Sequence, residues 1–308
     1  MRTVTSEPRP ATVFAVSITP FDDTGRIDEA GFRRHLQRMV AAGVGVYVGG
    51  GGSGEGFVLT ATERHRILEL AAEELGGKVP FRAMGVEARS AAEMIEYARV
   101  AQSVGVDAAQ IYSLDPGHGH LPTPDEVREY LVDVLSSTSV RSVVSTHQSV
   151  GYRISVETLA QVVDRFDHVI GVNCSHADLA YLTAIIDAVG DKVDVQVGGP
   201  LQALTALGLG AKGFLSSEAN LAPRLCNAVI AAYERAAGGE LFDAFGKLAR
   251  LSMALYDNGG IRATKAVLNR LGLPGGYPRK PQLPVDSATV DALMTVIEDL
   301  GIGRLEGW

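Results

Sequence analysis

The sequence has 308 residues and a mass of 32.5 kDa, which is too large for a small module and fits two ordinary domains or one large α/β barrel. Its 46% hydrophobic and 21% charged residues exclude a mainly disordered chain, and its glycines follow no triplet period, which excludes collagen. The net charge of −8 and the absence of any Lys/Arg run exclude nucleic acid and anionic membrane surfaces as expected partners.

The two cysteines, Cys174 and Cys226, form no CxxC pair and no disulfide framework, which favours a reducing compartment. The first 21 residues lack a signal-peptide hydrophobic region of the usual length, and no uncharged apolar run reaches the ~18 residues of a membrane helix. We therefore expect a cytoplasmic protein in which residues 1–10 form a flexible N-terminal arm.

Short runs rich in β-branched residues alternate with amphipathic segments along the chain. Strands are predicted at 14–18, 45–50, 79–86, 107–114, 141–146, 168–175, 193–199 and 212–218. Helices are predicted at 28–43, 60–77, 90–105, 123–138, 156–166, 178–190, 201–210 and 222–239.

These eight strand–helix units have continuous apolar strands, which indicates burial on both faces of a parallel sheet. They predict an α/β fold of the (β/α)8 TIM-barrel type over residues 11–239. Residues 240–308 are expected to form a C-terminal helical region packed on the barrel. A doubly wound open sheet is the alternative, but no GxGxxG motif opens the first helix.

In a TIM barrel, ligands bind at the carboxyl ends of the strands. The loop after the second strand contains Gly51, Gly52, Ser53 and Gly54, and its backbone N–H groups either hold a carboxylate or phosphate or simply form a flexible turn. Glu55 is either an acid or base, or a buried residue that fixes the loop. The residues expected to contact the substrate are Gly51, Gly52, Ser53, Glu55, Thr146, Gly198, Leu215 and Ser216.

Three segments resemble one known family. They are GGSGEGFVLTATER, VGGPLQALTALGLGAKGFLSSEANLAP and KAVLNRLGLPGGYPRKPQLPV, and their order and spacing are similar to those of the dihydrodipicolinate synthase / N-acetylneuraminate lyase family. The resemblance spans roughly residues 14–290. It implies a (β/α)8 barrel of the class I aldolase type, a helical C-terminal region, a small oxo-acid or carboxylate ligand, and a homotetramer.

The family's catalytic lysine has no counterpart at the matching position. The resemblance implies a Schiff base on a strand-six lysine assisted by a strand-five tyrosine, but Asn173 follows Ile170-Gly171-Val172 here, and the strand-five motif is replaced by 144–148. An amide cannot form an imine. Of the six lysines, Lys78, Lys192 and Lys212 are expected at the opposite end of the barrel, and the other three lie in the C-terminal region.

Polar side chains nevertheless gather at the predicted strand ends, and four of the seven histidines are among them. Imidazoles suit proton transfer near neutral pH, and they also suit a divalent metal or ordinary surface hydrogen bonding. Asn173 could donate to a substrate carbonyl or enolate, or satisfy nearby backbone. The candidate catalytic residues are His147, His176, His118, His120, Asn173 and Tyr112.

Two function classes remain open. The first is a lyase or hydro-lyase that acts on a small oxo-acid-type substrate by a histidine-assisted mechanism without a Schiff base. The second is a non-catalytic ligand-binding or regulatory protein on an aldolase scaffold. We expect no cofactor, although a divalent metal at the histidines stays open, and we expect the four histidines to form one cluster at the barrel mouth.

Overall fold

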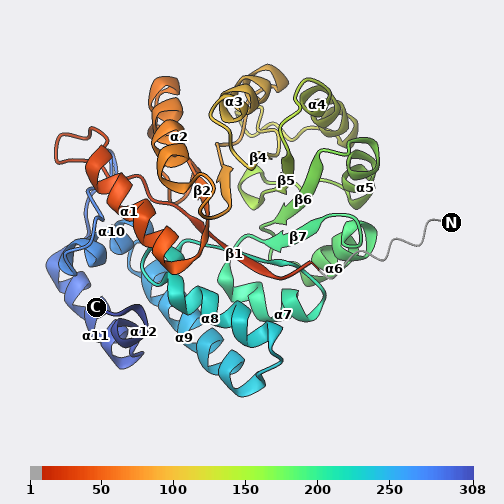
Figure 1. Cartoon of the computed structure of the whole chain (residues 1–308). Helices are drawn as coiled ribbons and strands as arrows, with labels where there is room; N and C mark the ends of the chain where they lie inside the picture. Colours follow the sequence, from red (N-terminus) through yellow and green to blue (C-terminus); the bar gives the residue numbers. More distant parts are fainter. Residues whose placement is uncertain (1–8) are drawn as a thin grey trace.

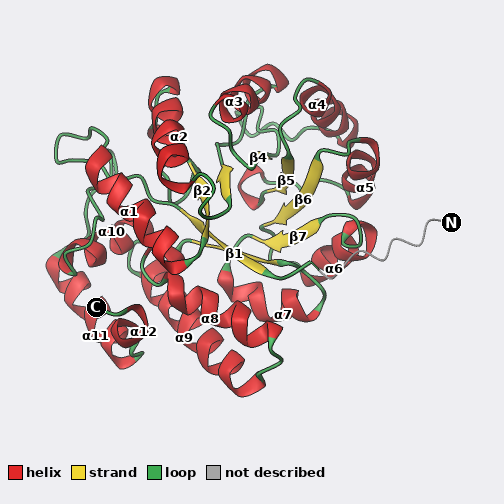
Figure 2. Cartoon of the chain, viewed as in Figure 1, coloured by secondary structure: helices red, strands yellow, loops and turns green. Residues whose placement is uncertain are grey.

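The computed structural model describes residues 9–308, and they form a closed barrel of eight parallel strands surrounded by helices (Figures 1 and 2). The strands follow one another in chain order, and β8 pairs with β1 to close the barrel. The predicted (β/α)8 barrel is therefore confirmed. The strands are β1 (Thr12–Val16), β2 (Gly45–Val48), β3 (Phe81–Ala83), β4 (Ala108–Ile111), β5 (Ser142–Thr146), β6 (Val169–Cys174), β7 (Asp194–Val197) and β8 (Gly213–Ser216).

One helix follows each strand and covers the outside of the barrel (Figure 1). Side-chain caps fix several of their starts: Thr60 and Thr123 each form a capping box, with Glu63 and Glu126. These caps supply hydrogen bonds that a helix start cannot make within itself. The helices are α1 (Glu29–Ala42), α2 (Ala61–Leu75), α3 (Ala91–Ser103), α4 (Pro124–Ser136), α5 (Val156–Arg165), α6 (Leu179–Val189), α7 (Ala203–Gly208) and α8 (Pro223–Glu234).

The predicted C-terminal helices follow the barrel as α9 (Gly238–Asp257), α10 (Ile261–Arg270) and α11 (Ser287–Asp299), and α9 packs beside α8. A further short helix, α12 (Ile302–Glu306), was not predicted, because Gly301 reads as a helix end. The Glu306 carboxylate accepts hydrogen bonds from the backbone N–H groups of Arg224 (3.3 Å) and Leu225 (2.9 Å) at the start of α8. The C-terminal region therefore stabilises a helix of the barrel itself.

One strand predicted at the N-terminal end has wrong boundaries. Strand β1 begins two residues earlier than predicted and ends at Val16, because the side chain of Asn220 takes the backbone N–H of Ile18 (2.9 Å) out of the sheet. Residues 1–8 of the predicted flexible arm lie outside the described residues. Arg9, which belongs to that arm, is held by the carbonyl of Gly190 (2.7 Å) and by Asp194 (3.0 Å).

Across the described residues, no helix combines the length and the apolar character that crossing a membrane requires.

Candidate functional site

The glycine-rich loop after β2 has a backbone that depends on its glycines. A Cβ atom on Gly54 would lie 2.8 Å from the Gly50 carbonyl oxygen and 2.9 Å from the Gly50 nitrogen, so the loop cannot take this fold with a side chain there. Glu55, the next residue, has a φ of +51°, which is unusual for a residue other than glycine. The loop is therefore a specific turn.

The same loop presents N–H groups that no protein group accepts. Within residues 9–308, the backbone N–H groups of residues 51–54 donate no hydrogen bond. Ser53 is 97% buried, and its hydroxyl lies 2.6 Å from the hydroxyl of Ser217, just after β8. Successive unpaired N–H groups beside a hydroxyl match the chemistry of a carboxylate-binding turn.

A cavity of about 240 Å³ adjoins this loop, and it is lined by Gly52 and Ser53, by the residues after β8 and by the C-terminal helices. Ser217 and Glu218 line its β8 side. Leu215 and Ser216, which were predicted for this role, are both buried, and the Ser216 hydroxyl donates to the Glu218 carboxylate (2.8 Å). The residue at this end of β8 that reaches the loop is therefore Ser217, directly after the strand.

Glu55 lies behind the loop, where it has no solvent exposure and forms an ion pair with Lys265 from α10. Its second carboxylate oxygen accepts the backbone N–H of Arg279 (2.9 Å). Of the alternatives for Glu55, the structure shows the geometry of a residue that fixes the loop. Lys265 lies in the C-terminal region, as predicted, and its ammonium group is held by Glu55 and by two backbone carbonyls.

Asn173 lies on β6 inside the barrel and is 97% buried. Its Nδ2 donates to Tyr47 Oη (3.2 Å) on β2 and to Gln110 Oε1 (2.6 Å) on β4. Among the described residues, its Oδ1 has no hydrogen-bond partner. In this arrangement both amide hydrogens of Asn173 are used and its unpaired atom is an acceptor, so a role for Asn173 as a donor to a substrate stays a prediction.

The polar network that surrounds Asn173 was not predicted from the sequence. Arg82 on β3 donates to Tyr47 Oη (3.1 Å) and places its guanidinium carbon 4.1 Å from the centre of the Phe14 ring. The signal was present, since Tyr47, Arg82 and Gln110 are polar residues in the middle of apolar strands. Such residues are costly inside a barrel unless they bind one another.

His147 follows β5 and contacts a carboxylate that the sequence analysis did not select. Its Nδ1 lies 2.7 Å from Glu87 Oε1, and Glu87 is on the loop after β3. The Ser149 hydroxyl lies 2.5 Å from that Nδ1 and donates to Glu87 Oε1 (2.5 Å). Burial acts to raise the pKa of Glu87, but the hydrogen bonds from His147 and Ser149 outweigh it and lower the pKa to about 2. Glu87 is thus an ionised partner of His147.

His176 follows β6 and is 91% buried, with its Nε2 unpaired among the described residues. Burial lowers the pKa of His176, and the positive charges of Arg153 and His147 lower it further, against an opposite effect of Asp178. His176 is therefore neutral at physiological pH. Its ring packs edge-on against Tyr181, with the ring centres 5.4 Å apart.

Tyr112 and Thr146 each contact a neighbouring ring or hydroxyl group of the protein. The Tyr112 ring meets the His147 ring edge-on at 5.8 Å. Burial raises the pKa of Tyr112, and the Glu87 charge raises it further, so its hydroxyl stays protonated. The Thr146 hydroxyl lies 3.0 Å from the hydroxyl of Tyr181 on α6.

Gly198 is required for close packing, because a Cβ there would lie 2.6 Å from the Ser175 Cβ. His118 and His120 lie in the loop after β4, and both are exposed. His118 has a φ of +54° between two glycines that also have positive φ. Within the described part of the chain, no three His, Cys, Asp or Glu side chains are arranged to hold a metal ion.

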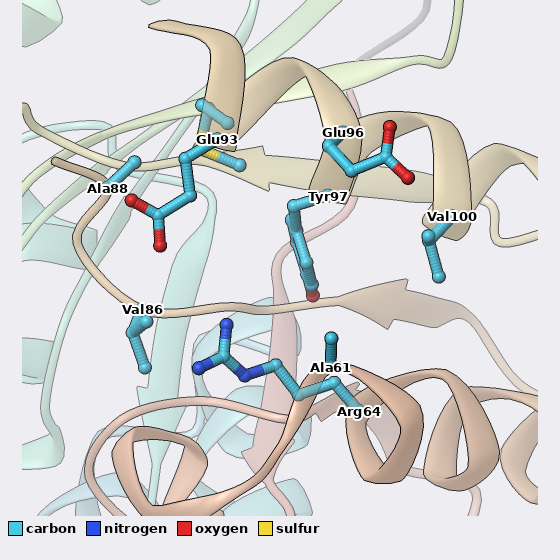
Figure 3. Close-up of a pocket in the computed structure, with 9 residues that line it drawn as sticks. Ala61, Arg64, Val86, Ala88, Glu93, Glu96, Tyr97 and Val100 are labelled. Carbon is cyan, nitrogen blue, oxygen red and sulfur yellow. The ribbon is translucent and has the colours of Figure 1, made fainter. Parts of the chain in front are cut away.

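A second cavity, of about 270 Å³, lies outside the barrel between α2 and α3 (Figure 3). Arg64 and Tyr97 face each other across it, and Glu93 lies at its edge. Val86 and Ala88 line this cavity, whereas Glu87 between them turns its carboxylate to His147. The cavity is therefore separate from the mouth of the barrel, although one loop serves both.

Comparison with known proteins adds one consistent assignment. Residues 9–300 match the model of the dihydrodipicolinate synthetase family. The chain is similar to the 4-hydroxy-tetrahydrodipicolinate synthases of Gluconacetobacter diazotrophicus (30% identity, covering 94% of this chain and 95% of the relative) and Methanopyrus kandleri (28%, covering 94% and 96%).

Solved structures show the same fold. A dihydrodipicolinate synthase from Thermotoga maritima is 21% identical, with a TM-score of 0.87, and the match covers 96% of this chain and 99% of that one. A structure described as a monomeric dihydrodipicolinate synthase variant is also 21% identical with a TM-score of 0.87, over 96% of this chain and 98% of that one.

Proposed function

The chain belongs to the dihydrodipicolinate synthetase family, and we propose that it is a lyase or hydro-lyase that acts on a small oxo-acid-type substrate without a Schiff base. One observation carries the proposal. Asn173 occupies the buried position on β6 at which the family resemblance implies a lysine, and a histidine–carboxylate pair lies at the end of the neighbouring strand β5. The amine is missing, but a group that can move protons is present.

The substrate carboxylate binds at the glycine-rich loop in this proposal. The unpaired N–H groups of residues 51–54 and the Ser53 hydroxyl supply its donors. The Oδ1 of Asn173 accepts a hydrogen bond from a hydroxyl of the same substrate, which gives that buried oxygen the partner it lacks. A hydroxylated oxo acid satisfies both requirements.

His147 is the proposed base. In a dehydration, its Nε2 takes the proton from the carbon next to the oxo group, the C–H electron pair forms a C=C bond, and the hydroxyl leaves as water after receiving a proton from His147. In a C–C cleavage, Nε2 takes the hydroxyl proton, the O–H electrons form a C=O bond, and the electrons of the broken C–C bond pass to the oxo group as an enolate. The protonated His147 then returns its proton to the enolate carbon, which is the carbon that lost the C–C bond.

The function is tested with a panel of oxo acids, with and without a β- or γ-hydroxyl, whose products are read by NMR. Turnover of a hydroxylated member that persists in the presence of a chelator supports the proposal. Binding of oxo acids without turnover of any of them contradicts it and favours the non-catalytic alternative.

The binding mode has its own test. Gly54→Ala is expected to weaken oxo-acid binding in calorimetry, because its Cβ would displace Gly50. Gly238→Ala is the matched control, since a Cβ there meets nothing within 4 Å. Equal affinities in the two variants would place the carboxylate elsewhere.

A further inference from the structure

Glu87 and His147 come from strands that are not neighbours, because β4 lies between β3 and β5. The carboxylate reaches across the end of β4, where the Tyr112 ring packs edge-on against the imidazole. The side chains of Glu87 and His147 are 20% and 34% exposed, so the contact is partly shielded from water. The backbone N–H of His147 is also held, by the Ser113 hydroxyl at 3.1 Å.

The hydrogen bonds around Nδ1 determine which ring nitrogen of His147 carries the proton. The single hydroxyl hydrogen of Ser149 points to Glu87 Oε1, so the Ser149 oxygen has no hydrogen left for the ring. Nδ1 then faces two oxygen atoms, Glu87 Oε1 at 2.7 Å and Ser149 Oγ at 2.5 Å. A bare nitrogen lone pair there would face only acceptors, which is unfavourable. The hydrogen of neutral His147 is therefore on Nδ1.

We propose that Glu87 is a positioning residue for His147: it accepts the Nδ1 hydrogen, fixes the ring in the Nδ1–H tautomer, and leaves Nε2 as the atom that takes the substrate proton. Ser149 completes the arrangement by donating to the same carboxylate oxygen. The catalytic part of this inference rests on the proposed function, whereas the tautomer is a property of the resting protein.

The carboxylate also stabilises the ring once the ring is charged. When Nε2 accepts a proton, His147 becomes an imidazolium whose positive charge lies beside an ionised carboxylate. The other titratable groups near the ring are Tyr112, which stays neutral, and His176, which is also neutral at physiological pH. Glu87 therefore supplies the negative charge that balances protonated His147.

The tautomer is read directly by long-range ¹H–¹⁵N NMR of histidine-labelled protein without substrate. In the wild type, the His147 resonances are expected to show a protonated Nδ1 and an unprotonated Nε2 above the pH at which the ring loses its charge. Glu87→Ala is expected to remove that preference and shift the ring toward the Nε2–H form that free histidine favours. Glu69→Gln is the matched control, because Glu69 lies 3.7 Å from the exposed His65 on α2.

Kinetics then separate this inference from the proposed function. Glu87→Gln keeps a hydrogen-bond acceptor but removes the charge. It is expected to lower kcat at least tenfold with little change in KM, because a positioned base contributes ~10²–10⁴-fold to the rate and this variant loses part of that contribution. An Nε2–H signal in the wild type overturns the inference whatever the activity. The expected tautomer together with unchanged turnover in His147→Ala leaves the tautomer standing and contradicts the proposed role of His147. Melting temperatures of Glu87→Gln and wild type within a few degrees show that the fold is not the cause.

Discussion

Lys265 on α10 forms an ion pair with Glu55 in the glycine-rich loop, and neither side chain has any solvent exposure. Lys265 also donates to the carbonyls of Thr19 (2.8 Å) and Tyr277 (3.0 Å). Burial lowers the pKa of Lys265, while the Glu55 charge acts in the opposite direction. The C-terminal region is thus tied to the loop for which we propose substrate binding, so the region stabilises the site although it lies outside the barrel.

Lys265→Met is expected to destabilise the protein by about 3–5 kcal/mol, because it leaves the Glu55 carboxylate buried without its countercharge. The double variant Lys265→Met/Glu55→Gln is expected to recover part of that loss. Urea unfolding provides the measurement. Lys247→Met is the control: Lys247 pairs with Asp243 at the surface, and such pairs contribute ~1 kcal/mol or less. Equal losses from Lys265→Met and Lys247→Met would show that the buried pair has no special role.

No Schiff base is expected with pyruvate. Asn173 cannot form an imine, and the one lysine that approaches the loop, among the described residues, is the paired Lys265. Borohydride reduction in the presence of pyruvate, followed by intact-mass measurement, should leave the mass unchanged. A family member that carries the strand-six lysine is the positive control. A reduced adduct on any lysine of this chain would refute the proposed mechanism.

The stability of the protein is expected to depend on Glu87 at acid pH. The pKa of Glu87 is lowered from 4.5 to about 2 in the folded protein, so the unfolded chain binds a proton first as the pH falls. The contribution of Glu87 is complete above pH 4.5 and is lost as the pH falls toward 2, with an upper bound of about 3 kcal/mol. Glu87→Gln should therefore narrow the difference in unfolding free energy between pH 6 and pH 3. An unchanged difference would contradict the folded-state pKa.

A homotetramer is expected in solution, on the basis of the family resemblance over most of the chain. Light scattering should give a mass of four times the 32.5 kDa of the chain. A similar fold is described as monomeric in one relative, so the barrel alone does not require assembly. A mass of 32.5 kDa would reject the tetramer.

The fold was predictable because its signals are local and repeat eight times. Each strand is a short buried run, and helix starts such as Thr123-Pro124 carry their own capping residues. The errors lie at the ends of elements, where tertiary contacts decide. Asn220, far along the chain, ends β1 by binding the Ile18 backbone, and no local pattern around Ile18 announces that contact.

The candidate site was predictable in position but not in its pairings. The strand ends identified His147, His176 and Asn173, because a barrel brings those ends together. They did not identify Glu87 as the partner of His147, since the contact crosses an intervening strand and depends on how one loop turns its side chain. Lys265 was missed as a neighbour of the loop for the same reason: α10 folds back over 210 residues of sequence.

The four histidines at the predicted strand ends are expected to differ in their effect on turnover. His147 has an ionised partner and lies close enough to the buried His176 to affect its pKa, so these two residues share one environment. His118 and His120 are exposed in the loop after β4, and their membership in the same cluster stays a prediction.

Replacing His147 by Ala should lower kcat by ~10²-fold or more, because the variant loses a positioned base, and should lower the melting temperature moderately, because Glu87 loses a hydrogen-bond partner. His176→Ala should lower both kcat and stability, since His176 is 91% buried and its removal leaves a void. His118→Ala and His120→Ala should have smaller effects, and His65→Ala on the outer face of α2 is the control. Once a substrate is found, kcat and melting temperature of all five variants are compared. Wild-type turnover in both His147→Ala and His176→Ala would show that neither imidazole moves a proton. Wild-type turnover in the His118 and His120 variants as well would exclude the histidine-assisted mechanism.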